Sequence, residues 1–354
     1  MNLLEKLESN ERLNYEDGLA LYELDLFTLA KYADRKRKAL HGKKAFFNVN
    51  RHINPTNICK DICKFCAFSS NRKNPHPHTL THEEILDIVK KSYKNNITEV
   101  HIVSAHNPAT GLEWYLEIFS KIKKEFPSLH VKALTAAEIN FLSEEYNLTY
   151  EQVIDKMIEY GVDSLPGGGA EIFDEEVRAY ICKGKVSSTD WLTIHGLWHS
   201  RGKESNATML FGHVEKRKDR IDHMLRLRNL QDKSGGFNAF IPLVYQRENN
   251  YLKVEDFLSS TEILKTYAIS RLMLDNIPHI KAYWATSTIN LALIALDFGA
   301  DDLDGSIEKE EIQSAAGASS AKGMNIKDFL DLITTSGFIP VERDSLYNEL
   351  KVYN

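Results

Sequence analysis

Apolar residues along this 354-residue chain follow two different periods. Before residue 44, leucines recur among charged residues at the spacing of an amphipathic helix, which predicts an N-terminal helical extension over residues 1–43. After it, short runs rich in β-branched and aromatic residues alternate with longer helical patterns. The runs that we expect to form strands are 45–53, 99–105, 129–136, 161–166, 206–212, 237–243, 279–285 and 300–306.

The segments between these runs carry helix start signals of the capping-box type, in which two side chains satisfy the first free N–H groups of a helix. The matching pairs are Thr81 with Glu84, Thr110 with Glu113, and Thr149 with Gln152. Alternating strands and helices give parallel strands with right-handed crossovers. Eight such units predict an α/β fold, a closed (β/α)8 TIM-type barrel over residues 44–320. A helical C-terminal tail, residues 321–354, is expected to pack on the barrel.

Composition narrows the classes of function. The net charge of −6 provides no bulk attraction to nucleic acid or to an anionic membrane. No run of about 18 apolar residues is present, and the charged N-terminus lacks the apolar core of a signal peptide. Four cysteines in a chain of this size indicate a reducing compartment. We therefore expect a cytoplasmic protein without a nucleic-acid or membrane partner.

Three of the four cysteines lie together in the stretch NPTNICKDICKFCAFSS, residues 54–70. Cys59, Cys63 and Cys66 follow the first predicted strand with the spacing C-x3-C-x2-C. They belong to a long connection, and long loops inside compact domains are usually functional or disordered. Cys182 has no neighbouring cysteine in the sequence and is expected to be a buried structural thiol.

Two kinds of metal site are compatible with three clustered thiols. A structural zinc ion needs four ligands, so His76 or His78 would have to supply the fourth, and the chain would be a zinc-stabilised ligand-binding barrel. A cubane iron–sulfur cluster on three cysteines leaves one iron open to a substrate. The cluster is favoured because the sequence has no second cysteine pair of the kind that structural zinc commonly uses.

The cysteine spacing, with the aromatic Phe65 before the last cysteine, resembles that of the radical S-adenosylmethionine superfamily. The stretches HINPTNIC, LPGGGAEIF, SNATMLFGHVE, KAYW and GADDLDGSI resemble the radical enzymes of the futalosine route to menaquinone. The similarity covers nearly the whole chain. Within this group, the SNATMLFGHVE and KAYW forms are most similar to the aminofutalosine synthases, with the cyclic dehypoxanthine futalosine synthases as the alternative.

This resemblance implies a [4Fe–4S] cluster on Cys59, Cys63 and Cys66, with S-adenosylmethionine on the open iron. It implies one-electron cleavage of S-adenosylmethionine, and hence an electron donor such as flavodoxin or ferredoxin. The 5′-deoxyadenosyl radical would add to 3-[(1-carboxyvinyl)oxy]benzoate. Rearrangement with loss of the enol carboxylate would give 6-amino-6-deoxyfutalosine and methionine. S-adenosylmethionine would be consumed as a substrate, and no catalytic acid–base dyad is expected.

Residues that follow the predicted strands are the candidates for cofactor binding. The resemblance places Phe65 near adenine; alternatively, it packs under the loop. Ser104, with Ala105, stands where related enzymes carry glycines near the methionine amino group. Glu138 either accepts hydrogen bonds from ribose or the methionine ammonium, or meets the dipole of its own helix.

A glycine triplet and several charged residues complete the set of candidates. Gly167, Gly168 and Gly169 either let a ligand approach the backbone or form a turn. The implied substrate carries two carboxylates, which favour arginine partners. The candidates for this contact are Arg72, Arg178, Arg247 as first choice, and His106, which is otherwise structural. Of Asp301, Asp302 and Asp304, at least one is expected to be a solvated turn residue.

Overall fold

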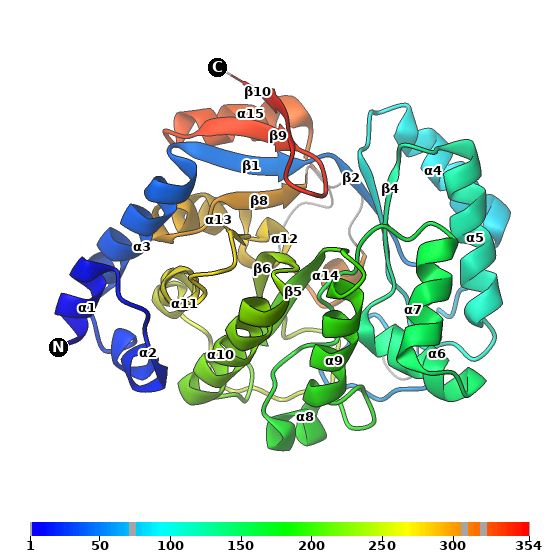
Figure 1. Cartoon of the computed structure of the whole chain (residues 1–354), viewed down its shortest axis with the longest axis horizontal. Helices are drawn as coiled ribbons and strands as arrows, with labels where there is room; N and C mark the ends of the chain where they lie inside the picture. The colour runs from blue at the N-terminus through cyan, green and yellow to red at the C-terminus, as the bar shows by residue number, and fades with distance from the viewer. Residues whose placement is uncertain (1, 71–75, 306–310, 319–323, 354) are drawn as a thin grey trace.

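The computed structural model describes residues 2–70, 76–305, 311–318 and 324–353. Three N-terminal helices, α1 (Leu3–Ser9), α2 (Tyr15–Leu21) and α3 (Leu26–His41), lie together on one side of the molecule (Figure 1). Helix α3 packs against α11 (Ser260–Met273), and its Leu29, Tyr32 and Ala33 are buried. The helical extension predicted before residue 44 is therefore present, and it covers part of the outer helical layer.

The central strands form a closed ring. They are β1 (Lys44–Asn48), β2 (Asn50–Ile53), β3 (Glu99–Ile102), β4 (His130–Ala133), β5 (Ser205–Phe211), β6 (Phe237–Val244), β7 (His279–Ile280) and β8 (Asp302–Gly305). Parallel ladders join β2–β3–β4, β5–β6–β7 and β1–β8. Single bridges close the gaps between them: Lys132 with Ser164, Leu165 with Ser205, and Lys281 with Asp302. The predicted (β/α)8 barrel is confirmed.

Three predicted strands differ from their expected form. The run 279–285 is reduced to β7, and helix α12 (Trp284–Ser287) already begins within it. The run 45–53 is split into β1 and β2 at Val49, because its first half pairs with β8 while its second half pairs with β3. The run 161–166 is reduced to the two bridges at Ser164 and Leu165. Pro166 follows at once, and a proline lacks the N–H group that would continue a ladder.

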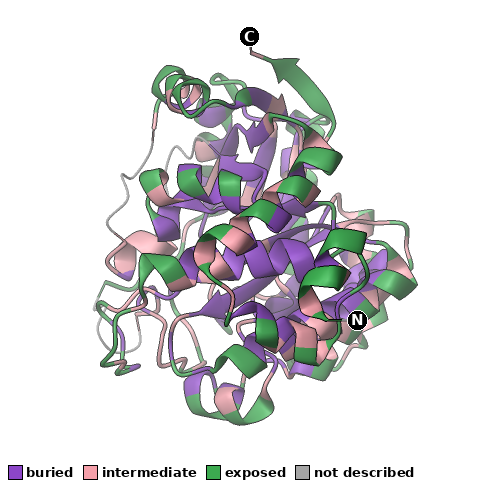
Figure 2. Ribbon diagram, turned by 90° about the vertical axis from the view of Figure 1, so that its left-hand side faces the viewer, coloured by how far each residue is buried: buried purple, intermediate pink, exposed green. Residues whose placement is uncertain are grey.

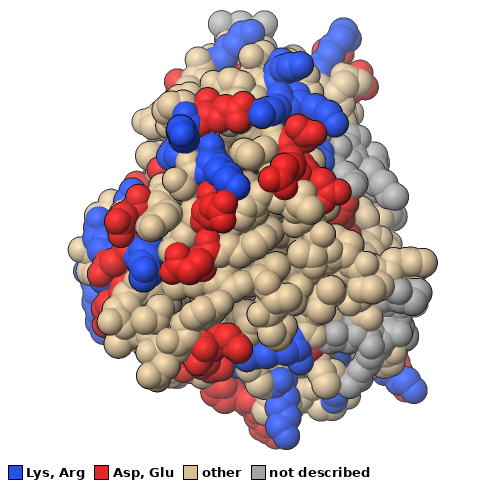
Figure 3. All heavy atoms as spheres, turned by 90° about the vertical axis from the view of Figure 1, so that its right-hand side faces the viewer, with Lys and Arg blue, Asp and Glu red and all other residues tan. Residues whose placement is uncertain are grey.

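Helices surround the ring, with buried residues along the strands and exposed residues on the outer helix faces (Figures 1 and 2). The remaining helices are α4 (His82–Tyr93), α5 (Leu112–Glu125), α6 (Ala136–Tyr146), α7 (Tyr150–Glu159), α8 (Glu175–Ile181), α9 (Ser188–His199), α10 (Arg217–Ser234), α12 (Trp284–Ser287), α13 (Ile289–Ala295), η1 (Leu296–Phe298) and α14 (Ile312–Ala315). None of the described helices is long and apolar enough to cross a membrane. Figure 3 shows acidic and basic side chains intermixed on one face, with a band of uncharged surface between them.

Two of the three predicted capping boxes are confirmed and one is wrong. Thr81 caps α4 and Thr149 caps α7, and the N–H of each threonine donates in return to the side chain of the third helical residue. Helix α5 instead begins after Gly111, because the Thr110 hydroxyl is used in a bond to the carbonyl of Asn107. A box that we did not predict, Thr135 with Glu138, caps α6.

The C-terminal region contains the helix that we expected, and the segment after this helix adds two strands that we did not predict. After α15 (Ile326–Thr335) the chain forms β9 (Ile339–Arg343) and β10 (Glu349–Val352). Strand β9 pairs in parallel with β1 over Lys44–Phe47, and β10 covers its other edge. Because β1 does not pair with β3, one edge of β1 is open, and β9 pairs with that edge. The boundaries predicted at 43/44 and 320/321 stay predictions.

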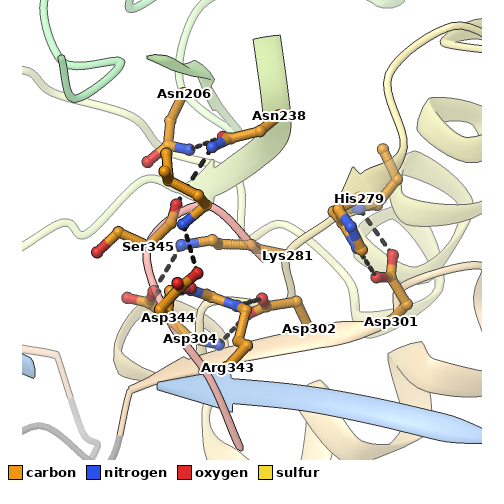
Figure 4. A network of polar contacts seen from close by, with 12 residues as sticks. Asn206, Asn238, His279, Lys281, Asp301, Asp302, Asp304, Arg343, Asp344 and Ser345 are labelled. Atoms are coloured by element: carbon orange, nitrogen blue, oxygen red, sulfur yellow. Dashed lines mark hydrogen bonds and ion pairs between the residues drawn. The ribbon is translucent and has the colours of Figure 1, made fainter. Parts of the chain in front are cut away.

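Charged side chains fill the lower part of the barrel beside this C-terminal region. Figure 4 shows Lys281, Asp304, Asp302 and Arg343 close together, with His279 and Asp301 paired nearby. Lys281 Nζ lies 2.7 Å from Asp304, and Arg343 Nε lies 2.5 Å from Asp302. All three of Asp301, Asp302 and Asp304 are buried, so the expectation that one of them is a solvated turn residue is wrong.

Candidate functional site

A cavity of about 310 Å3 lies inside the barrel and reaches the C-terminal ends of its strands. Cys59, Cys63 and Cys66 contribute to its lining, so the structure brings all three thiols to one space. The other predicted residues that line it are Phe65, Ser104, His106, Glu138, Gly167, Gly168 and Gly169. In α/β barrels this end of the strands carries the chemistry, as the sequence indicated.

The loop of residues 54–70, here called the cysteine loop, is tied to the barrel by main-chain bonds between the cysteines. The N–H of Lys60 donates to the carbonyl of His106 at 3.0 Å, and the N–H of Lys64 donates to Ile181 at 2.7 Å. The carbonyl of Lys64 accepts from Tyr251 and Leu252 at 2.7 and 2.9 Å. These bonds connect the loop to three separate post-strand segments, which holds its side chains in place.

The thiols lie in a mostly desolvated setting with N–H donors close by. Burial raises the pKa of Cys59, opposed by main-chain contacts from His106 and Asp61, and it raises the pKa of Cys63 well above its ordinary value. The N–H of Ser69 points at Cys66 Sγ from 3.4 Å. Thiolates in such a setting need a bound cation to stay charged, and N–H donors to sulfur tune the potential of iron–sulfur clusters. The donor set fits a cluster held by three cysteines.

His106 belongs to the wall of this site rather than to its open space. Its Nδ1 lies 2.8 Å from a carboxylate oxygen of Asp61 in the cysteine loop. Its ring stacks on Phe141 of α6 with centroids 5.0 Å apart and planes at 2°. The side chain is buried and clamps the cysteine loop to α6, which supports the structural alternative for this residue.

A buried ion pair that the sequence did not reveal also lines the cavity. Lys185 Nζ lies 2.6 Å from Glu171, and its charge is 5.6 Å from the ring centroid of Phe65. Burial opposes the charge of Lys185, but Glu171 and Cys63 raise its pKa well above the ordinary value. Apart from histidines, Lys185 is the single cationic side chain among the described lining residues. Its ammonium group can pair with the carboxylate of a ligand bound beside the cysteines.

The deeper part of the cavity is polar. His52 on β2, His101 on β3, Asn206 and Thr208 on β5, and Asp304 on β8 contribute to the lining. These residues lie within the strands, whereas the cysteines lie beyond the strand ends, so they form the floor. Burial lowers the pKa of His52 and lowers that of His101 well below its ordinary value, which leaves both rings neutral at pH 7.

Comparison with known proteins agrees with this geometry. The model of the radical SAM superfamily matches residues 53–227, and that of the CofH/MqnC C-terminal region matches residues 234–354. Aminodeoxyfutalosine synthase of Thermus thermophilus is 42% identical, with 99% of this chain and 96% of the relative covered. The chain belongs to the radical SAM superfamily. It is therefore an enzyme of the kind that uses a [4Fe–4S] cluster and S-adenosylmethionine.

Further relatives are similar to this chain over most of its length. Aminodeoxyfutalosine synthase of Streptomyces coelicolor is 39% identical over 99% of this chain and 94% of the relative. Cyclic dehypoxanthine futalosine synthase of the same organism is 35% identical over 99% and 89%. Among solved structures, methylornithine synthase (PylB) is similar in fold, with a TM-score of 0.77, 19% identity, and 96% and 97% of the two chains covered.

The replacement of glycines by Ser104 and Ala105 does not strain this radical SAM loop. Neither residue, both of which the structure describes, adopts a positive φ. The N–H of Ser104 donates to Glu138 Oε1 at 2.8 Å, and Glu138 Oε2 accepts from the N–H of Thr135 at 2.7 Å. Glu138 thus caps α6 and fixes the loop after β3, and burial raises its pKa. Its predicted contact with the cofactor stays a prediction.

The glycine triplet is required by the protein itself. A Cβ on Gly167 would lie 2.8 Å from the main-chain nitrogen of Thr208, and Gly169 has a φ of +89°. The carbonyl of Gly167 accepts from the Thr208 hydroxyl at 2.6 Å, and that of Gly168 from the indole of Trp191 at 3.2 Å. The turn alternative is therefore supported, while ligand approach stays a prediction.

Gly167→Ala is expected to lower the free energy of unfolding by about 1–3 kcal/mol, because the new methyl group meets backbone that cannot move aside cheaply. Urea denaturation followed by circular dichroism would measure it. Gly196→Ala is the matched control, since its Cβ would meet Leu230 at an ordinary 3.5 Å within α9. Equal stability of the Gly167 variant and the control would contradict the assignment.

Arg178 and Arg247, the two predicted arginines that the structure describes, do not line the cavity. Arg178 is buried and donates to the main-chain carbonyls of Gly169, Ala170, Ile172 and Val186. It therefore stabilises the loop that contains the glycine triplet. Arg247 donates to the carbonyls of Val254 and Glu255 and stacks on Phe257. Arg72 lies outside the described residues. The predicted contacts of Arg178 and Arg247 with substrate carboxylates find no support in this arrangement.

The zinc alternative lacks a fourth ligand in the described part of the chain. Neither His76 nor His78 is among the described residues that line the cavity with the three cysteines. The histidine that approaches a cysteine is His106, in a group with Cys59 and Asp61. Its Nδ1 is occupied by Asp61, so the donor set favours iron–sulfur chemistry over a Cys3His zinc site.

Proposed function

We propose that this chain is an aminodeoxyfutalosine synthase, also called aminofutalosine synthase. It would join the 5′-deoxyadenosyl group of S-adenosylmethionine to 3-[(1-carboxyvinyl)oxy]benzoate and release 6-amino-6-deoxyfutalosine, methionine and the lost carboxylate carbon. The observation that carries the proposal is the 42% identity over 99% of the chain, together with three clustered thiols on one barrel cavity. Cyclic dehypoxanthine futalosine synthase, with a relative at 35% identity, is the competing activity that the test must separate.

In this proposal Cys59, Cys63 and Cys66 hold the [4Fe–4S] cluster and leave one iron for S-adenosylmethionine. A cluster bound by these residues would supply the electron for reductive cleavage of the sulfonium. Lys185, beside Cys63 and Phe65, offers a cation for the methionine carboxylate. Flavodoxin or ferredoxin would deliver the electron, and the reaction would take place in the cytoplasm.

The chain's own residues would protect a reactive radical. Leu210, Ile241 and Leu243 place apolar side chains along the cavity between the cysteines and the polar floor. The hydroxyl of Tyr245, which also lines the cavity, is bound to Asn250 and to the carbonyl of Leu252, each at 2.8 Å. A wall of this kind excludes water and holds polar hydrogens away from the reacting carbon.

The test is a product analysis. The cluster is reconstituted without oxygen and reduced, S-adenosylmethionine and the enol ether are added, and products are identified by mass spectrometry. We expect one molecule that contains both the adenosyl carbon and the aryl ring, with the enol carboxylate lost. Free 5′-deoxyadenosine as the sole adenosyl product would refute the proposal and direct the next assay to dehypoxanthine futalosine. Omission of the reductant is the control.

A further inference from the structure

The floor of the cavity presents two histidines whose hydrogen-bonding capacity the protein leaves partly unused. His52 and His101 are opposite each other in the β2–β3 ladder, and their rings lie 4.7 Å apart at 65°. His101 Nε2 has no hydrogen-bond partner among the described residues. His52 Nε2 has a long contact of 3.4 Å with the amide of Asn50. Because a buried polar atom without a partner is costly, a ligand that supplies one binds favourably here.

The charges around this pair already cancel one another. The charged groups that act on it are Glu99 on β3, Lys132 on β4, Lys281 after β7 and Asp304 on β8. Glu99 pairs with Lys132 at 2.6 Å, Asp304 pairs with Lys281 at 2.7 Å, and the neighbouring Arg343 pairs with Asp302. No described cation on the floor is therefore free to neutralise an entering anion. The histidines are the groups that can gain a charge.

The proposed acceptor needs such a receptor. Its vinyl carbon must reach the adenosyl carbon at the cysteine end, which places the ring carboxylate at the other end of the molecule. Lys185, the one lining cation beside the histidines in the described chain, is at the cysteine end and is paired with Glu171. A neutral floor that holds two imidazoles is the remaining place for this second carboxylate.

We propose that His52 and His101 together bind the ring carboxylate of the aromatic acceptor. This inference rests on the proposed function and names its substrate-positioning residues. Binding brings one uncompensated negative charge into a low-dielectric floor, which favours protonation of the imidazole pair. The pair therefore takes up a proton as the carboxylate enters, and affinity for the acceptor rises as pH falls toward the ordinary range of histidine.

The experiment is calorimetric titration of the enol ether into the reconstituted enzyme, with S-adenosylmethionine present and no reductant, so that no turnover occurs. His52→Gln and His101→Gln are each expected to raise Kd by about 10- to 100-fold, the range for a lost bond to a charged group. His130→Gln is the matched control: this ring lies on the same barrel, is bonded to the Ser164 hydroxyl at 2.7 Å and does not line the cavity. Repeating the titration in buffers of different ionisation enthalpy should show uptake of about one proton by the parent enzyme and less by the variants.

A second ligand, without the ring carboxylate, distinguishes carboxylate binding by the two histidines from a purely structural role of these residues. The analogue 2-phenoxyprop-2-enoate lacks the ring carboxylate. The parent enzyme should therefore bind this analogue as weakly as the histidine variants bind the full acceptor. The histidine variants should bind the analogue with the same Kd as the parent does. Unchanged Kd values in both variants, or equal losses in His130→Gln, would overturn the inference. If the parent binds the acceptor with proton uptake but forms no adduct, the proposed function fails and the subsite stands. If the parent enzyme forms the adduct while both variants bind the acceptor normally, the subsite alone fails. If the parent enzyme does not bind the acceptor, the proposed function and the subsite both fail.

Discussion

Cys63→Ala is expected to remove the cluster and to lower adduct formation by more than about 100-fold, beyond the 10- to 100-fold that loss of an outer partner of a metal site costs. Cys63 lies at the centre of the C-x3-C-x2-C spacing, and its half-buried thiol lines the cavity with Lys185. With two thiolates left, no cubane can be held with one open iron. Iron analysis and the visible absorption of the reconstituted variant would measure the loss directly, independently of turnover.

Cys182→Ala is the matched control for this prediction. Cys182 is buried at the C-terminal end of α8, and burial raises its pKa to about 11, so the thiol is neutral. Unlike Cys59, Cys63 and Cys66, it is not among the described residues that line the cavity. We expect full iron content and turnover in this variant. Retention of the cluster in Cys63→Ala, or its loss in Cys182→Ala, would contradict the three-ligand assignment and the open iron on which the proposed chemistry depends.

Features set by local sequence were predictable, because the residues that cause them are neighbours in the chain. The boxes at Thr81 and Thr149 are confirmed for this reason, as is the position of the cysteine loop after the first strand. Thr110 shows the limit of such patterns. Its hydroxyl has a competing acceptor three residues earlier, the carbonyl of Asn107, which no spacing rule includes.

The cavity floor was missed because it depends on closure of the ring. Asn48, Asn50 and His52 alternate along the first strand, so their polar character did mark one face of it. Which face points inward, and that His101 lies opposite His52, follow from the register of the β2–β3 ladder. For Arg178, the predicted contact with the substrate finds no support. Its position after a strand could not show that main-chain carbonyl groups already accept its hydrogen bonds.

Arg343→Met is expected to lower the free energy of unfolding by about 3–5 kcal/mol, the usual loss when one partner of a buried ion pair is removed. Arg343 is 1% exposed, and its Nε lies 2.5 Å from Asp302. Its guanidinium also stacks on the ring of Tyr347, 4.1 Å from the centroid. Burial opposes the charge, but Asp302 and Tyr347 raise the pKa of Arg343, so the guanidinium is charged at every accessible pH. Methionine fills a similar space without compensating the aspartate.

Urea denaturation of the variants would measure this loss. Arg12→Met is the matched control, since Arg12 pairs with Asp232 and Asp275 at the surface, where such pairs contribute about 0–1 kcal/mol. Adding Asp302→Asn to Arg343→Met should restore much of the lost stability, because it removes the charge left without a partner. A loss in Arg343→Met no larger than in the Arg12 variant would show that the C-terminal region is not fastened to the barrel through this pair. A large loss with rescue by Asp302→Asn would show that the buried pair between β9 and β8 fastens the C-terminal region to the barrel.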